Sequence, residues 1–585
     1  MENDNVISND QDVANVFNTF FLQNNTAKHE NTFNNQKKNT LETIYKDYKQ
    51  HPSILKIREK VQIKGTFSFN TITCQDMEKE ITNLDPNKAL PFNDIPVNIL
   101  RSNMDILSPY ITDTFNNSIL SSTFPDSLKL AEVSPTHKKD DTTDKKNYRP
   151  ISILPTVSKL FERNLYNQIN SYMEKYLSPH LCGFRKGFST QDCLIVMLEK
   201  WRRGLDKKEK AAAILTDLSK AFDSLNHNLL IAKLQAYGFD ENSLNLIYDF
   251  ISNRMQRTKV NNVFSPWGYI TAGVPQGSIL GPLLFNIFIN DLFLFITDIQ
   301  VANYADDNTP YATDKNIEFL LEKLQSETSI LNDWFAFNDL LSNNDKSKLL
   351  VTHDQNVSVK LGKDVIVPSE SVKLLGITID NKLTFQQHVS KMCKKTSQKI
   401  HALSRISKFM DSNKLKLIMR TFIENEFNYC PLTWMFHNRT LNNKINKLHE
   451  RALRLVYNNE TSNFSELLSM DHAFTIHERN LQKLATLMYK VKNNISPVIV
   501  SNIFNTQEIS YNLRNEKIWE KSNVRTTLYG TETISYRGPE IWRNVPENIR
   551  NSESLCKFKK EIKSWKPLGC TCRLCKTFVP NLGFL

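Results

Sequence analysis

Two adjacent carboxylates, Asp306 and Asp307, are the residues of this chain whose types and spacing point most directly to chemistry. They stand in Val301-Ala-Asn-Tyr-Ala-Asp-Asp-Asn-Thr-Pro310, after the apolar run Leu292 to Val301, and the pattern predicts a strand, a turn and a strand. Two charges about 4 Å apart repel by about 1 kcal/mol in water and by more near protein. The pair therefore indicates either a polar turn in solvent or a divalent-metal site for phosphoryl chemistry.

A third carboxylate, Asp217, follows Ala211-Ala-Ala-Ile-Leu-Thr216, a short apolar run typical of a buried strand. A carboxylate at the end of such a strand is well placed for a site, but it can equally be a loop residue or a helix N-cap. A helix is expected next, with apolar residues at helical spacing: Phe222, Leu225, Leu229 and Leu234. If the strand lies beside the predicted hairpin, three carboxylates meet at one edge of a small α+β sheet. Divalent cations there could orient a primer 3′ hydroxyl and stabilise leaving pyrophosphate.

A glycine cluster precedes the hairpin in a chain that has only 15 glycines. Gly273, Gly277 and Gly281 surround Pro275-Gln276, which indicates close approach of the backbone to a neighbour; a tight loop would explain the same spacing. A buried helix is expected to follow as far as Phe295.

A basic segment lies further upstream. Ala131 to Thr136 predicts a strand that leads to Lys138 and Lys139, and Asn147-Tyr-Arg-Pro-Ile-Ser-Ile-Leu154 follows an acidic loop. A hairpin with such a basic tip could close over a triphosphate, and a solvated charged loop is the plainer interpretation.

The remaining pattern is mostly helical. Helices are predicted for 72–120 with a proline-rich loop at 85–96, and for 157–173, 192–201, 244–252 and 317–337; strands are predicted for 254–260 and after the turn in 341–351, and a hairpin for 372–380. The stretch from 384 to about 489 is helical and basic, as a solvated face or a duplex-binding surface would be.

The composition of the chain indicates which kinds of partner it can bind. Lys and Arg number 74 against 62 Asp and Glu, giving a net charge of +12 that suits a polyanionic partner. The start of the chain has no secretory pattern and the nine cysteines are scattered, which indicates a reducing compartment. The expected location is the nucleus and cytoplasm. The most apolar stretch, Ile279 to Ile296, is too interrupted to span a bilayer, and no membrane partner is expected.

The C-terminal Cys570-Thr-Cys-Arg-Leu-Cys575 offers three thiolates, one ligand short of a structural zinc site. No histidine lies downstream, so zinc is not expected unless Cys556 or a partner supplies the fourth ligand.

Taken in series, these segments resemble the reverse transcriptase of non-LTR (LINE-type, jockey-like) retrotransposons. The resemblance covers about residues 80 to 390 and rests on six motifs: Asn147–Leu154, Leu215–Asp223, Gly273–Pro282, Tyr304–Asp307, Asn343–Ser347 and Leu374–Ile377. It implies a right-hand polymerase of fingers, palm and thumb, with a ferredoxin-like palm and a mostly helical C-terminal region.

The resemblance also implies roles for single residues. Asp217, Asp306 and Asp307, helped by the Leu218 carbonyl, would hold two Mg²⁺ ions, with Mn²⁺ as an alternative. Phe222 would exclude a 2′-hydroxyl; the other implied nucleotide-binding residues are Lys138, Lys139, Arg149, Gln276 and Gly277. Lys346 would protonate pyrophosphate, and Arg185 and Gly376 would contact primer or template.

The domains implied are a polar, partly disordered segment 1–60, a helical extension 61–123, fingers and palm 124–383, a helical thumb or connector 384–490, and a C-terminal region 491–585. The partners implied are an RNA template, a DNA primer or target, deoxynucleoside triphosphates and the element RNA. The family's upstream endonuclease is expected to be absent, so target nicking is not assigned to this chain. It would be a truncated element or a polymerase module alone, with a separate endonuclease as a candidate further partner.

The match departs from the family pattern at an early loop. Pro91 and Asn93 stand where the family usually has Gly and Asp, and the aspartate of this chain, Asp94, is shifted by one position. A catalytically inactive or co-opted retroelement fragment that binds nucleic acid is the main alternative. Phe222 argues against a viral RNA-dependent RNA polymerase, and the flanking regions argue against a group II intron maturase.

Overall fold

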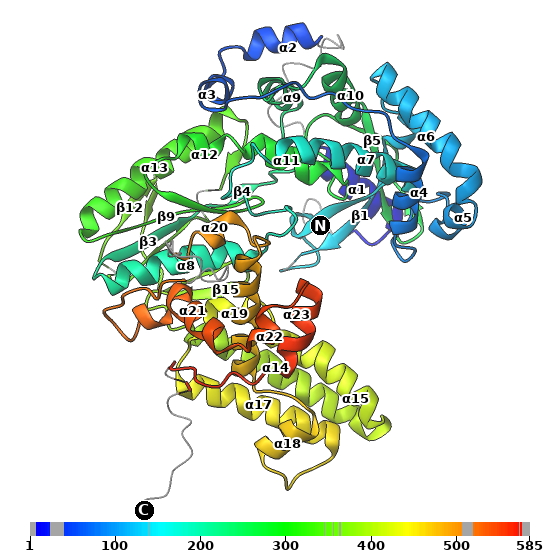
Figure 1. Ribbon diagram of the computed structural model, residues 1–585. Helices are drawn as coiled ribbons and strands as arrows, with labels where there is room; N and C mark the ends of the chain where they lie inside the picture. Colours follow the sequence, from blue (N-terminus) through cyan, green and yellow to red (C-terminus); the bar gives the residue numbers. More distant parts are fainter. Residues whose placement is uncertain are drawn as a thin grey trace, which may run out of the picture. The chain divides into compact units, whose positions relative to one another are not determined.

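The computed structural model describes residues 7–23, 40–138, 140–343, 346–354, 356–361, 364–505, 519–572 and 574–575. The chain forms two compact units, each made of separate segments. Unit 1 comprises Met1–Ser178, Asp217–Thr297 and Ile330–Asn343, and unit 2 comprises Pro179–Thr216, Asp298–Ser329 and Asn344–Leu585. Both units mix helices with mainly antiparallel sheets, which confirms the predicted α+β class (Figure 1).

Unit 1 contains a five-stranded sheet in the order β2-β1-β5-β6, with β7 also paired to β5, and a small β10-β4 ladder. Its strands are β1 (Leu130–His137), β2 (Tyr148–Ile153), β4 (Leu218–Ser219), β5 (Arg254–Val260), β6 (Val263–Phe264), β7 (Gly268–Ile270) and β10 (Leu341–Ser342). Its helices are α1 (Asp10–Gln23), α2 (Leu41–Tyr48), α3 (Pro52–Lys60), α4 (Cys74–Asn83), α5 (Val97–Ser102), α6 (Met104–Ser121), α7 (Thr156–Met173), α9 (His227–Ala236), α10 (Glu241–Ile251), α11 (Leu280–Ile289) and α12 (Leu292–Phe295).

Unit 2 is built on a four-stranded antiparallel sheet in the order β11-β3-β9-β8. Its strands are β3 (Lys210–Leu215), β8 (Gln300–Tyr304), β9 (Asp307–Asp314), β11 (Lys348–Val351), β12 (Val359–Leu361), β13 (Asp364–Ile366), β14 (Ser371–Leu374) and β15 (Ile377–Asp380). Its helices are α8 (Thr190–Asp206), α14 (Gln386–Ile406), α15 (Ser412–Ile418), α16 (Pro431–Trp434), α17 (Arg439–Tyr457), α18 (Phe464–Met470), α19 (Ile476–Lys492), α20 (Val498–Ser501), α21 (Ile534–Asn544), α22 (Glu547–Arg550) and α23 (Leu555–Glu561), while α13 (Ile317–Phe337) has residues in both units.

Small residues let helix α8 pack closely on the unit 2 sheet. Helix α8 contacts β3, β8 and β9, and β3 presents the fully buried alanines 211 to 213. A Cβ added to Gly204 of α8 would lie 3.0 Å from the Thr313 Cγ2 of β9, tighter than ordinary packing allows. The apolar run that predicted a buried strand therefore forms the centre of this sheet.

Most predicted elements are confirmed, including the strand 254–260 and the helix 317–337. One is wrong in part: Phe222 and Leu225 precede the helix in which they were expected, because α9 begins only at His227. Asn226 caps that helix by accepting a hydrogen bond from the Leu229 N–H at 3.0 Å, and Lys220 with φ 53° turns the chain before it. No helix among the described residues is long and apolar enough to cross a membrane.

Candidate active site

The tip of the β8-β9 hairpin carries the two adjacent carboxylates. Tyr304 pairs with Asp307 across the ladder, so Ala305 and Asp306 form a two-residue loop. Ala305 has φ 58°, the left-handed conformation that two-residue hairpin loops use. Asp306 is partly buried and Asp307 is exposed, which gives both carboxylates access to solvent.

Two buried asparagines hold this loop through hydrogen bonds to its carbonyl groups. Asn303 Nδ2 donates to the Ala305 carbonyl at 3.1 Å and to Asn308 Oδ1 at 2.9 Å, and Asn308 Nδ2 donates to the Asp306 carbonyl at 3.2 Å. The amide N–H groups of both asparagines thus hold the loop backbone, while Asn303 Oδ1 has no hydrogen-bond partner among the described residues. The sequence analysis missed both residues as site residues, although an asparagine on each side of a two-residue hairpin loop is a readable signal.

The strand β3 lies beside this hairpin, which is the condition that the sequence analysis set for the carboxylates to meet. Thr216, directly after β3, donates its N–H and its Oγ1 to the Asn308 carbonyl at 3.1 and 2.8 Å. Asp217 is the next residue in the chain and belongs to unit 1, where its carbonyl accepts a hydrogen bond from the Asn343 N–H at 2.8 Å. Leu218 is buried and pairs with Ser342 in the β10-β4 ladder.

A second segment of unit 2 supports the hairpin loop closely. Leu181 forms a parallel bridge with Asn303, and a Cβ added to Gly183 would lie 2.4 Å from the Ala305 backbone nitrogen. Only glycine fits so near that backbone. Arg185 follows in this segment, donates to the Leu181 carbonyl at 3.1 Å and lies over the Phe188 ring.

Within unit 1, the glycine-rich loop packs against the segment that carries Phe222. Gly273 has φ 82°, and Val274 N–H donates to the Phe222 carbonyl at 2.9 Å. Gln276 Nε2 donates to Asp223 Oδ1 at 2.8 Å. The Phe222 ring stacks on Phe285 with ring centroids 4.4 Å apart, so its orientation is fixed by packing.

The loop also meets the basic hairpin of unit 1. Ser152 N–H donates to the Gln276 carbonyl at 2.8 Å, and a Cβ added to Gly277 would lie 2.2 Å from the Ser152 oxygen. In the same hairpin, Lys138 N–H donates to the Asn147 carbonyl and the exposed Arg149 pairs with Thr136. Lys139 lies outside the described residues.

Asp223 is a titratable residue of this region that the sequence analysis did not select. Burial raises the pKa of its carboxyl from 3.8 to about 6, while the hydrogen bond from Gln276 and the nearby Lys220 act in the opposite direction. The carboxyl therefore changes charge close to neutral pH.

The two remaining predicted residues lie apart from the hairpin tip in sequence. Lys346 is exposed, directly after residues 344–345, which lie outside the described part. Gly376, with φ 82°, completes a two-residue turn with Leu375 between β14 and β15, and Tyr429 Oη donates to the Leu375 carbonyl at 2.7 Å.

The predicted residues therefore fall into two groups, one within each unit. Unit 1 holds Lys138, Arg149, Asp217, Leu218, Phe222, Gln276 and Gly277, and unit 2 holds Arg185, Asp306, Asp307, Lys346 and Gly376. The hairpin tip offers carboxylate oxygens, which are the ligands that hard divalent cations such as Mg²⁺ prefer. The donor set thus fits a divalent metal site.

Comparison with known proteins identifies the class. The family model for reverse transcriptase (RNA-dependent DNA polymerase) matches residues 136–379. This range contains the paired β3-β9 core, the hairpin tip and the glycine-rich loop. This segment of the chain is thus similar to reverse transcriptases, a family that generally uses divalent metal ions.

The particular relatives are proteins of mobile elements. The chain is 27% identical over 365 residues to "Probable RNA-directed DNA polymerase from transposon BS" of Drosophila melanogaster, covering 59% of this chain and 40% of that protein. It is 27% identical over 397 residues to "RNA-directed DNA polymerase from mobile element jockey" of the same species, covering 65% of this chain and 43% of that protein. It thus spans less than half the length of these relatives, which are of the non-LTR kind that the motifs indicated.

Proposed function

We propose that the chain copies RNA into DNA, adding deoxynucleotides to a primer 3′ hydroxyl on an RNA template. The observation that carries the proposal is the pairing of Thr216 with Asn308 in a chain that matches the reverse transcriptase family. This pairing supports a site in which Asp217, one residue beyond Thr216, acts with Asp306 and Asp307.

In this proposal the three carboxylates, with the Leu218 carbonyl, hold two Mg²⁺ ions, and Mn²⁺ can replace them. Bound divalent ions stabilise the attacking and leaving oxygens of an in-line phosphoryl transfer. The carboxylates contribute by fixed geometry, because Asn303 and Asn308 hold the loop that carries Asp306. Lys346 donates a proton to the leaving pyrophosphate.

We propose that the predicted site residues of unit 1 recognise the incoming nucleotide. The stacked Phe222 ring lies under the sugar and excludes a 2′-hydroxyl, and Gln276 and Gly277 contact the base pair that is being formed. Lys138, Lys139 and Arg149 contact the triphosphate, for which basic side chains are suited. The hydrogen bonds that join Ser152, Gln276 and Asp223 support these residues acting together.

The architecture proposed is a right hand with fingers and a ferredoxin-like palm in 124–383, a helical thumb or connector in 384–490, a C-terminal region in 491–585, and the segments 1–60 and 61–123 before them. Arg185 and Gly376 contact the primer and template. We propose the element RNA and a DNA target as partners, in the nucleus and cytoplasm.

Primer extension tests this function. The full chain is incubated with oligo(dT) annealed to poly(rA), dTTP and Mg²⁺, beside the double variant Asp306→Asn, Asp307→Asn. Asp314→Asn is the matched control, because Asp314 lies at the other end of β9 and accepts a hydrogen bond from the Asn316 N–H that asparagine can also accept. Extension by the wild type and the control, with none by the double variant, is the expected result.

The same assay decides against the alternative of a nucleic-acid-binding protein without catalysis. Wild-type protein that binds the primer and template but extends no primer would contradict the polymerase proposal. Extension that survives in the double variant would contradict the assignment of the metal site.

A further inference from the structure

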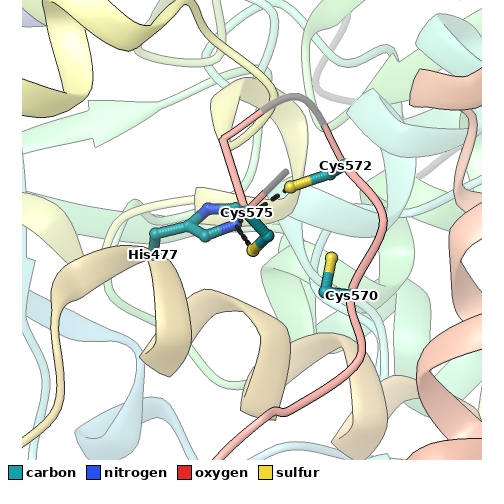
Figure 2. A group of neighbouring side chains, drawn as sticks. All are labelled: His477, Cys570, Cys572 and Cys575. Carbon is teal, nitrogen blue, oxygen red and sulfur yellow. Dashed lines mark hydrogen bonds between the residues drawn. The ribbon is translucent and has the colours of Figure 1, made fainter. Parts of the chain in front are cut away.

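Four side chains that can bind a metal lie together in unit 2, and none of them is among the residues proposed for polymerisation. They are His477, Cys570, Cys572 and Cys575, and their ligand atoms all lie within 4.8 Å of one another. The His477 Nε2 is 3.3 Å from the Cys572 sulfur and 3.4 Å from the Cys575 sulfur. Figure 2 shows the imidazole at the beginning of a helix, facing the sulfurs of the C-terminal loop.

These separations suit a small tetrahedral metal. Zinc bonds of about 2.3 Å to sulfur and about 2.0–2.1 Å to nitrogen give ligand atoms about 3.5–3.8 Å apart. The two nitrogen–sulfur distances lie close to this range and the other separations do not exceed 4.8 Å. None of the three cysteines takes part in a disulfide.

Burial distinguishes this cluster from a chance gathering of surface residues. His477 is 6% exposed and Cys572 is 3% exposed, and Cys570 is also buried. The His477 Nδ1 has no hydrogen-bond partner within the described part of the chain, and the Nε2 faces two thiols. A metal bound through Nε2 would give this nitrogen and the two thiolates a common partner.

The protein positions the histidine through a helix cap. Thr475 and Glu478 form a capping box at the start of α19, with the Glu478 N–H donating to Thr475 Oγ1 at 3.2 Å and the Thr475 N–H donating to the Glu478 carboxylate at 2.9 Å. His477 therefore lies in the first helical turn, in a segment whose direction is fixed.

The cysteine loop is also held by hydrogen bonds that involve no ligand atom. Thr571, between two of the cysteines, donates its N–H to Glu540 of α21 at 3.1 Å and receives a hydrogen bond from Arg537 at 2.9 Å. Gly569, with φ 79°, allows the turn just before Cys570. Hydrogen bonds outside the cluster thus position both the helix that carries His477 and the loop that carries the cysteines.

We propose that His477, Cys570, Cys572 and Cys575 bind one zinc ion, which fastens the C-terminal segment to helix α19. Three thiolates and one imidazole complete a closed tetrahedral set with no position for substrate, so the ion is structural. Cys556, the fourth ligand considered from the sequence, lies exposed on α23 and outside the cluster. The histidine comes instead from far upstream in the sequence.

Metal analysis of the full chain tests this proposal. Protein purified under reducing conditions without added chelator is expected to contain about one zinc per chain. The variants Cys572→Ser and His477→Gln are expected to lose most of it, and Cys556→Ser is the matched control that retains it. A wild type without zinc, or equal zinc in all four proteins, would overturn the proposal.

A spectroscopic readout keeps the test decisive if a variant fails to fold. Wild-type protein whose zinc is replaced by Co²⁺ is expected to show the visible bands of tetrahedral cobalt and thiolate charge-transfer absorption, and added Zn²⁺ should abolish both. Absence of these bands, or a disulfide between any two of the three cysteines in the protein as purified, would overturn the site.

Discussion

At the scale of single residues, Phe222 carries the clearest prediction about substrate choice. Its ring stacks on Phe285, and in the proposed function it lies under the sugar and excludes a 2′-hydroxyl. We expect Phe222→Val to incorporate UTP opposite poly(rA), reducing the preference for dTTP over UTP by about 10- to 100-fold. Steady-state kcat/KM for the two nucleotides measures the change; an unchanged ratio would contradict the assigned role.

Asp223 carries a prediction about pH. Because its pKa is about 6 in the folded protein against an ordinary value of 3.8, its ionisation opposes folding. The penalty is absent below about pH 4, grows as the pH rises to about 6, and is then constant at no more than about 3 kcal/mol.

Asp223→Asn should therefore raise the thermal unfolding midpoint of the reverse transcriptase segment at pH 7, and the gain should shrink as the pH falls towards 4. Asparagine keeps an oxygen that can accept the hydrogen bond from Gln276. A gain that is equal at both pH values would show that the carboxyl is not the cause.

At the scale of elements, the segment before α8 determines how the hairpin tip is held. An alanine at Gly183 would bring its Cβ to within 2.4 Å of the Ala305 backbone nitrogen, so the loop that carries Asp306 would have to move. We expect Gly183→Ala to lower the rate of primer extension by about 100-fold, since a displacement near 1 Å has this effect on catalysis.

Gly187 supplies the control for that variant. It lies in the same segment, and a Cβ there meets no atom within 4 Å. Its φ of 88° is one that asparagine tolerates better than other residues, so Gly187→Asn should keep the activity. Equal losses in the two variants would mean that the segment, rather than the contact with Ala305, matters.

The sequence predicted these elements well where the pattern is local. The apolar run 211–216 predicted β3, and the residues around Asp306 and Asp307 predicted the hairpin. That the two are neighbours was only a condition in the sequence analysis, and the structure shows it. The helix around Phe222 was predicted too early, since apolar spacing does not reveal that Asn226 is the cap.

What the sequence could not show is contact between distant segments. Nothing near Gly183 indicates that its backbone touches Ala305, and nothing near Cys570 indicates His477. A search for zinc ligands by sequence spacing considers only residues close to Cys570 in the sequence. The fold instead brings in His477 from helix α19.

At the scale of the whole molecule, the charge of +12 predicts how nucleic acid is bound. Affinity for an RNA–DNA duplex should fall by about 100-fold or more between 50 and 200 mM salt, because binding releases counterions from the phosphates. Fluorescence anisotropy of a labelled duplex without Mg²⁺ measures this. An affinity that is independent of salt would argue against a phosphate-binding surface.

The central claim is that the carboxylates at the hairpin tip act in metal-dependent nucleotide addition and not in holding the nucleic acid. Single-turnover incorporation of one dTTP into a pre-bound primer–template, followed over a range of Mg²⁺ concentrations, tests it most directly. For Asp306→Asn we expect unchanged primer–template affinity with a rate lowered by about 100-fold or more, equivalent to about 3 kcal/mol. A wild-type rate in the variant, or a loss explained entirely by weaker binding, would contradict the account.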